Sequence, residues 1–418
     1  MAKLLFTCGN LALKGGVERV VVNLANALQK QGYEVEILSY YKDSKAAAPC
    51  VYPLDPSIKL SYLYPYDEPV RRGLSRIFWR FFGYIITNVL LNKRHKACIV
   101  IESHFSFLYP IFKAANTRYV RIMHIEISRY KKRKNGYFDA LVFLSQSEFD
   151  KWGAMHPRAV KIPNSIPLPF EDLSPNLASN QAYISLLDSI DPGAKEELIN
   201  PNPYLSPHSL KHCRAALLAA LLFRESRPYL KPRPTVLAVG RLAKQKGFER
   251  LISAWSRVAS LYPSWHLDIV GEDCGEGESL KRQIQNLGLE DSVRLRPFTP
   301  HIQVQYLLAS LFALSSYMEG MPMVLLEAMA HGLPLLAYKI DSILECFEDN
   351  GILACNDDEF CAGLARLMAD EGLRLRLGWR GALLAKTRFS QEVVIGEYRA
   401  LFDSMLDGGG GGGATRAS

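Results

Sequence analysis

The sequence predicts an α/β protein that consists of two Rossmann-like domains with an inserted segment between them. The chain of 418 residues is longer than one hydrophobic core usually serves, which favours two domains. In both halves, short apolar runs of strand length alternate with stretches of helical periodicity, as in a parallel sheet covered by helices. Residues 171–234 interrupt this alternation, because they are rich in Pro, Ser and Asn and carry little strand signal.

We therefore expect five regions along the chain. They are an N-terminal Rossmann-like domain over 1–170, an insertion or linker over 171–234, a C-terminal Rossmann-like domain over 235–390, a helix over 391–407 that returns to the N-terminal domain, and a tail over 408–418. The tail is dominated by glycine, so we expect it to be flexible.

The first half opens with a β-loop-α-β unit. Residues 3–7 are an expected buried strand, and Gly15 and Gly16 end the loop after it. Val and Leu residues then recur at helical spacing as far as Gly32, and residues 34–39 predict the second strand. Further strands are expected at 97–101, 119–123 and 140–144.

The second half repeats the alternation from Thr235. Its strand-like runs are TVLAVG, HLDIV, VRLR, LFALS and PLLA. Helices are expected at 248–261, 279–287, 301–309, after Pro322, at 359–370 and at 374–387. This order is that of a doubly wound sheet, which binds ligands at the carboxyl ends of its strands.

Composition excludes several classes of protein. With 48% hydrophobic and 22% charged residues, neither a disordered chain nor a polytopic membrane protein is expected. The longest uncharged apolar run, Phe81–Leu91, is too short to span a bilayer, and the N-terminus lacks a secretory cleavage site. The eight cysteines show no metal-ligand spacing, so we expect buried thiols in a reducing compartment and no metal site.

The segment MEGMPMVLLEAMAHGLP carries two carboxylates, Glu319 and Glu327. Pro322 favours the first turn of a helix, so Glu319 and Gly320 are expected in the loop and Met323 in the helix. The free N–H groups of that turn can hold phosphate oxygens, and carboxylates can accept hydrogen bonds from sugar and ribose hydroxyls. The alternative is a structural helix with surface glutamates.

The segment VGRLAKQKGF places Arg241 and Lys246 on the loop between a buried strand and its helix. Such a loop lies at the carboxyl end of a strand, where open α/β sheets bind ligands. An arginine fork and a lysine point charge can neutralise a departing diphosphate. The alternative is a pair of solvated surface cations.

The GRL-x3-KG loop and the E-x7-E segment together resemble the donor domain of glycosyltransferase family 4. The resemblance is specific over residues 235–345, and GGVERVVVNLANALQKQGYEV and IPNSI are similar to further segments of the family. It implies the GT-B fold, in which two Rossmann-like domains face each other across a cleft. Two departures are Ser165, where the family usually has glycine, and the long stretch 171–234.

The resemblance also implies roles for residues. Arg241 and Lys246 would contact the donor diphosphate, Glu319 the transferred sugar and Glu327 the ribose. The remaining donor-binding residues would be Gly15, Gly16, Gly320, Met321, Met323 and Val324. Glycine's missing Cβ would let the first loop approach the diphosphate closely.

Two histidines are further candidates. His124 matches a position where the family often has a histidine near the sugar, and we count it as catalytic with Arg241, Lys246 and Glu319. His104 is a candidate on the acceptor side. For each, a loop histidine satisfied by backbone groups is the alternative.

The implied reaction is a retaining hexosyl or N-acetylhexosaminyl transfer from a nucleotide-diphosphate sugar. Uridine is the preferred base, because the family often uses it. We find no obvious carboxylate nucleophile and therefore expect same-face substitution, assisted by positioning and charge stabilisation. No DxD-like carboxylate pair lies beside the phosphate loops, so we expect no metal and no cofactor.

A membrane surface is the expected meeting place with a lipid-linked or cell-surface glycan. The chain carries a formal charge of +8, and residues 71–96 combine basic flanks with aromatic residues and contain no acid. A second basic run is RYKKRK at 129–134. We expect a cytoplasmic protein, peripheral on the inner face of the plasma membrane; a core helix with solvated ends is the alternative.

Three rival functions remain. An inactive GT-B binding or scaffold protein would keep the fold without catalysis, against which the intact Arg241, Lys246, Glu319 and Glu327 argue. A nucleic-acid-binding protein is disfavoured, because the aromatic residues of the basic stretches are interleaved with aliphatic ones. A nicotinamide oxidoreductase is disfavoured because no GxGxxG follows a strand.

Overall fold

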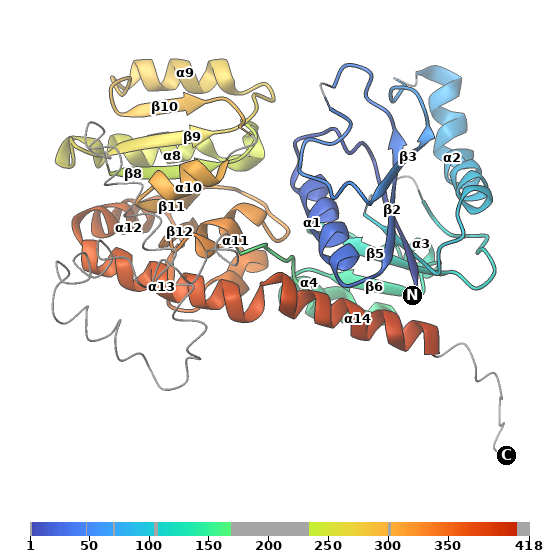
Figure 1. The fold of residues 1–418 in the computed structure, drawn as a ribbon. Helices are drawn as coiled ribbons and strands as arrows, with labels where there is room; N and C mark the ends of the chain where they lie inside the picture. The colour runs from blue at the N-terminus through green and yellow to red at the C-terminus, as the bar shows by residue number, and fades with distance from the viewer. Residues whose placement is uncertain are drawn as a thin grey trace, which may run out of the picture. The chain divides into compact units, whose positions relative to one another are not determined.

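The computed structural model describes residues 2–46, 48–69, 72–103, 108–168, 234–299 and 302–407 (Figure 1). Within them the chain forms two compact units. Of the described residues, the first unit contains those within 2–165, 319–323 and 391–407, and the second contains 166–168, 234–299, 302–318 and 324–390. The expected insertion, except Pro234, and the expected tail lie outside the described residues.

The first unit is built on a parallel sheet with the strand order β3-β2-β1-β4-β5-β6-β7. Its strands are β1 (Lys3–Cys8), β2 (Glu34–Tyr41), β3 (Lys59–Tyr64), β4 (Ile99–Glu102), β5 (Arg118–Met123), β6 (Ala140–Phe143) and β7 (Ala159–Lys161). The chain winds outward from β1 to β3 and then crosses back to β4, so the order reverses between β1 and β4. This reversal makes the carboxyl ends of β1 and β4 a place for ligands.

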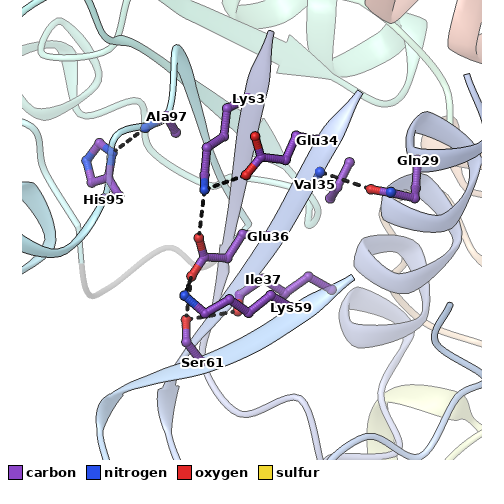
Figure 2. Close-up of polar contacts among 10 residues, drawn as sticks. All are labelled: Lys3, Gln29, Glu34, Val35, Glu36, Ile37, Lys59, Ser61, His95 and Ala97. Atoms are coloured by element: carbon purple, nitrogen blue, oxygen red, sulfur yellow. Dashed lines mark hydrogen bonds and ion pairs between the residues drawn. The ribbon is translucent and has the colours of Figure 1, made fainter. Parts of the chain in front are cut away.

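Charged residues at the amino ends of β1, β2 and β3 match the strand register, as Figure 2 shows. Lys3 Nζ lies 2.7 Å from Glu34 Oε1 and 3.5 Å from Glu36 Oε2. Lys59 Nζ lies 3.2 Å from Glu36 Oε1, to which Ser61 also donates a hydrogen bond at 3.1 Å. Opposite charges on neighbouring strands stabilise this pairing at the sheet edge away from the carboxyl ends.

The helices of the first unit are α1 (Gly16–Lys30), α2 (Gly73–Arg94), α3 (Lys132–Asn135), α4 (Gln146–Trp152) and α14 (Gln391–Asp407), and η1 (Gly153–Met155) is a short 3-10 turn. The C-terminal helix α14 packs beside α1. The rings of Tyr33 and Phe402 meet edge to face at 6.2 Å. Arg118 Nε also donates to the Met405 carbonyl at 3.2 Å, so the last helix belongs to the first unit.

The second unit has a parallel sheet with the order β10-β9-β8-β11-β12-β13. Its strands are β8 (Thr235–Val239), β9 (His266–Val270), β10 (Val293–Arg296), β11 (Leu311–Leu314), β12 (Leu335–Tyr338) and β13 (Gly351–Ala354). The order reverses between β8 and β11, which again marks their carboxyl ends as a ligand position. Trp255 is fully buried in the core of this unit.

The α-helices of the second unit are α8 (Phe248–Ser256), α9 (Gly277–Asn286), α10 (Ile302–Leu308), α11 (Met323–Ala330), α12 (Asp357–Ala369) and α13 (Glu371–Arg388). In the described part of the chain, three short 3-10 segments accompany them, η3 (Lys244–Lys246), η4 (Ala259–Leu261) and η5 (Asp341–Cys346). The expected helix 248–261 is shorter than predicted, because α8 ends at Ser256. Cys274 and Cys355 are exposed, so the expectation of buried thiols is wrong for these two. No helix within the described ranges has the length and hydropathy that a bilayer span requires.

Candidate active site

The loop after β8 carries Arg241 and Lys246 at the point where the strand order reverses. The Arg241 side chain is exposed and forms no ion pair or hydrogen bond with the described part of the chain. The aliphatic stem of Lys246 packs over Gly240, where an added Cβ would lie 3.3 Å from the lysine Cδ. At the carboxyl end of a central strand, the loop therefore presents a guanidinium with no partner in the described ranges and a lysine whose stem is packed.

Gly247 allows this loop to turn into α8. Its φ of +61° lies in the left-handed region, which favours glycine. An added Cβ would lie 2.2 Å from the Ser315 carbonyl oxygen, on the loop after β11. The missing side chain thus lets the loops that follow β8 and β11 touch.

Arg250 holds the loop after β11 and was not anticipated from the sequence. Its Nε donates to the Ser315 carbonyl at 2.6 Å and its Nη2 to the Ser316 carbonyl at 2.5 Å. The guanidinium carbon lies 4.0 Å from the ring centre of Tyr317 and 3.7 Å from that of Tyr338. Burial lowers the pKa of Arg250, with nearby acidic groups acting in the opposite direction. The available signal was its position three residues after Gly247, one helical turn into α8.

Gln245 joins the two loops from the other side. Its backbone carbonyl accepts from Tyr317 N at 2.9 Å, and its side-chain amide donates to the Met318 carbonyl at 2.8 Å. Tyr317 also donates through its hydroxyl to Glu249 Oε1 at 2.8 Å. These contacts, together with those of Arg250, hold residues 315–318 in place immediately before Glu319.

Glu327 is held inside the second unit on α11. It is 2% exposed, and its Oε2 accepts a hydrogen bond from the Tyr306 hydroxyl at 2.7 Å. The Tyr306 ring stacks on His331 with 5.1 Å between ring centres, and His331 Nδ1 lies 2.7 Å from the Glu327 carbonyl oxygen. Glu319 is only 7% exposed. The alternative of two surface glutamates is therefore wrong.

Residues 319–323 pack with the first unit. A Cβ on Gly320 would lie 2.3 Å from the His124 carbonyl oxygen, so only glycine fits there without a shift. The Asn164 side-chain amide donates to the Met321 carbonyl at 2.9 Å. The structure thus brings His124 and the IPNSI segment to the loop that begins with Glu319. The sequence does not predict this role for Asn164, the third residue of IPNSI.

The other predicted residues are placed as follows. Met321 and Met323 are buried, and Val324, in α11, is half-buried. Gly15 precedes α1 and lies under Glu18, whose Oε2 would be 2.2 Å from an added Cβ, whereas Gly16 faces open space. His104 lies outside the described residues.

A buried carboxylate at the end of β4 was also missed. Glu102 is inaccessible to solvent, and its Oε2 accepts from Thr7 Oγ1 at 2.5 Å and from the Tyr40 hydroxyl at 2.5 Å. Burial, and next the charge of Glu102, raise the pKa of Tyr40, so the phenol stays protonated as a donor. The available signal for Glu102 was its position as the last residue of β4, two residues before His104.

No group of three or more potential metal-ligating side chains is found within the described ranges. The arrangement in the second unit is instead cationic at the β8 loop. Cations of this kind can stabilise an anionic leaving group.

Comparison with known proteins gives two successive family matches. Residues 14–168 match the family described as Glycosyltransferase Family 4, and residues 223–382 match Glycosyl transferases group 1. An uncharacterized glycosyltransferase of Haemophilus influenzae is 26% identical over 427 residues, which cover 96% of this chain and 100% of the relative.

Two further relatives match over part of their length. The amylovoran biosynthesis glycosyltransferase AmsD of Erwinia amylovora is 34% identical over 178 residues, 42% of this chain and 50% of that protein. The lipopolysaccharide core biosynthesis glycosyltransferase LpsD of Rhizobium meliloti is 31% identical over 172 residues, 40% of this chain and 49% of that protein.

A solved structure shares the fold. A variant of S. aureus TarM, crystallised with fondaparinux, alpha-GlcNAc-glycerol and UDP, superposes with a TM-score of 0.69 at 12% identity and covers 96% of this chain and 100% of its own. The paired parallel sheets, the two successive family matches and the full-length relative agree: this chain is a glycosyltransferase of the family 4 type with the GT-B fold.

Proposed function

We propose that this glycosyltransferase moves a hexose or N-acetylhexosamine from a UDP-sugar to a lipid-linked or cell-surface glycan, with retention of anomeric configuration. The observation that carries the proposal is the exposed Arg241 guanidinium, which has no ion-pair or hydrogen-bond partner among the described residues and shares the β8 loop with Lys246. Relatives named for lipopolysaccharide core and amylovoran biosynthesis support the acceptor class. The UDP bound to TarM supports the donor class.

In the proposed reaction the acceptor hydroxyl attacks the anomeric carbon on the face from which UDP departs. The bond from that carbon to the β-phosphate oxygen breaks, the new glycosidic bond forms, and the acceptor proton passes to a phosphate oxygen of UDP. Arg241 and Lys246 stabilise the negative charge that grows on the leaving diphosphate. These two cations supply the needed positive charge, so the proposed mechanism uses no metal or cofactor.

The buried carboxylates suit the hydroxyl groups of the donor. The Tyr306 hydrogen bond orients Glu327, which we assign to the ribose, and Glu319 is assigned to the transferred sugar. The first N–H groups of α11, near Met323 and Val324, would receive phosphate oxygens. Gly320 and Met321 lead into that turn. His124, whose carbonyl packs against Gly320, is assigned to the sugar as well.

The remaining donor and acceptor assignments lie in the first unit. Gly15 and Gly16 would admit the diphosphate at the start of α1, where Gly16 faces open space. His104 is proposed to contact the acceptor. We place the enzyme on the cytoplasmic side, peripherally on an anionic membrane, because a lipid-linked acceptor is reached there.

The test compares Arg241→Ala and Lys246→Ala with two matched controls. Lys244→Ala removes an exposed lysine from the same loop, and Arg294→Ala removes an exposed arginine from β10. Loss of one transition-state contact costs ~3 kcal/mol, or roughly a hundredfold in turnover. We expect that loss in the two site variants and near wild-type rates in the controls, measured as release of UDP from a panel of UDP-sugars with and without acceptor.

Three outcomes would contradict the proposal. Turnover of the site variants within twofold of wild type would remove the two cations from the mechanism, and a strict requirement for Mg²⁺ or Mn²⁺ after chelation would contradict a metal-free reaction. A protein that binds UDP-sugars in calorimetry yet neither hydrolyses nor transfers them would be an inactive binding protein.

A further inference from the structure

We propose that α2 docks on an anionic lipid surface by inserting an exposed apolar stripe between the headgroups. The stripe consists of Leu74, Ile77, Phe78, Phe82 and Val89. This deepens the proposed function, since it states how the enzyme reaches a lipid-linked acceptor. The observations behind it are independent of the donor site.

The first observation is that α2 exposes apolar side chains on one side, although its other side already packs Leu91 into the core. Leu74 is 84% exposed, and Phe82 is 51% exposed, while Thr87 and Asn88 are buried. The inward polar groups are satisfied, because Thr87 Oγ1 lies 3.1 Å from the Tyr64 hydroxyl and Asn88 Oδ1 accepts from Phe112 N at 2.8 Å. A helix of a monomer normally buries its apolar face and exposes its polar one.

The second observation is that the stripe is continuous. Leu74, Phe78 and Phe82 are spaced four residues apart, so they lie one above the other on one side of the helix. The rings of Phe78 and Phe82 are in contact, with 5.2 Å between their centres. From Leu74 to Val89 the stripe runs about 22 Å at the rise of an α-helix. An apolar strip of this length on one helix marks an interaction surface.

The third observation is the charge at both ends of the stripe. α2 contains no acidic residue; Arg72 precedes it, and Lys93 and Arg94 form its last turn. Arg72, Lys93, Arg94 and the following Lys96 are all exposed. Cations that flank an apolar strip suit an anionic lipid surface, where the cations meet headgroups and the apolar residues meet the acyl boundary.

The same charges disfavour a second copy of this chain as the occupant. In an antiparallel pair of stripes, Arg72 of one copy would face Lys93 and Arg94 of the other. In a parallel pair, each cation would face the same residue of the other copy. Like charges then lie opposite one another in both arrangements, which weakens the association. A lipid surface has no such conflict.

A second basic segment adjoins α2. The Lys134 ammonium lies 5.9 Å from the ring centre of Tyr84, on α2, and 4.6 Å from that of Tyr109. Lys132 and Arg133, its neighbours in α3, are exposed. The run 129–134 therefore extends the cationic surface of the first unit beside the helix.

The experiment uses the full-length protein and vesicles of phosphatidylcholine with or without phosphatidylglycerol. Phe78→Ser with Phe82→Ser removes two exposed rings and leaves the net charge unchanged. The matched control is Leu261→Ser with Leu375→Ser, two exposed leucines of the second unit. We expect partition onto anionic vesicles to fall at least about tenfold in the stripe variant and to stay unchanged in the control.

Leu74→Ser tests the same idea with a substitution that should not disturb folding, because Leu74 is the most exposed residue of the stripe. It should weaken vesicle binding while UDP affinity and hydrolysis of the donor stay at the wild-type level. Salt at 0.5 M should reduce the binding of the wild type, since the attraction of the cations is screened.

Vesicle binding by both stripe variants equal to that of wild type overturns the inference. So does a wild type that is dimeric in sedimentation and becomes monomeric on Phe78→Ser with Phe82→Ser, because the stripe is then a contact between copies. Turnover of Arg241→Ala within twofold of wild type would contradict only the proposed function, so the two failures are distinguishable.

Discussion

Arg250→Met should reveal how strongly one side chain supports the donor loop. Methionine keeps an apolar stem beside Tyr317 and Tyr338 but removes the guanidinium that donates to the Ser315 and Ser316 carbonyls at 2.6 and 2.5 Å. Each hydrogen bond from a charged donor contributes ~1.5 kcal/mol at the lower end of the usual range, and each ring contact adds ~0.5 kcal/mol. Methionine does not carry the desolvation cost of the half-buried guanidinium, which offsets about 1 kcal/mol of this loss.

The expected loss in the free energy of unfolding is therefore about 3 kcal/mol. Urea unfolding monitored by fluorescence of Trp255, which is buried in the same unit, measures it. UDP affinity in calorimetry should fall in parallel, because Ser315 to Met318 leads directly into Glu319. Arg250→Lys should recover part of both losses, since an ammonium can reach only part of the bonding of the fork.

The matched control is Arg257→Met. Arg257 caps the end of the same helix and pairs with Asp358 at 2.7 Å, but both side chains are well exposed. Exposed ion pairs contribute little, so the control should unfold like wild type and bind UDP normally. If Arg250→Met is as stable as Arg257→Met, the loop does not depend on the guanidinium and the reasoning fails.

Three further predictions concern other contacts. Tyr306→Phe removes the hydroxyl that donates to Glu327 at 2.7 Å and should weaken UDP binding several-fold in calorimetry, with turnover at saturating donor less affected. Gly247→Ala forces a Cβ to 2.2 Å from the Ser315 carbonyl at a φ of +61° and should cost at least ~2 kcal/mol of unfolding free energy in urea, whereas an unchanged midpoint would show that the loops can separate. Burial lowers the pKa of His95, whose Nδ1 accepts from Ala97 N, below its ordinary value of 6.5 (Figure 2). The unfolded chain then binds the proton first, so stability should fall as pH drops below about 6.5, and His95→Gln should flatten that part of the pH profile in thermal melts.

Part of this architecture could be predicted because short stretches of the sequence determine it. Strand-length apolar runs, helical periodicity and Gly or Pro at the element ends indicate β1, α1, β8 and α8 directly. The donor loop follows from the same logic, since Arg241 and Lys246 come just after a buried strand. The edge strands β3, β7 and β13 were not predicted, because KLSYLY has no clear apolar run and because AVK and GILA are short.

The remaining features depend on contacts between residues that are distant in the chain, and local sequence patterns do not predict which of these residues come into contact. The sequence determined the two Rossmann-like sheets and the order of the cations and carboxylates along the chain. Only the tertiary structure decided that Arg250 holds the carbonyls of Ser315 and Ser316, that Gly320 packs on His124, and that Glu327 is oriented by Tyr306. Burial of Thr87 and Asn88 on α2 was likewise decided in three dimensions, because their partners come from Tyr64 and Phe112.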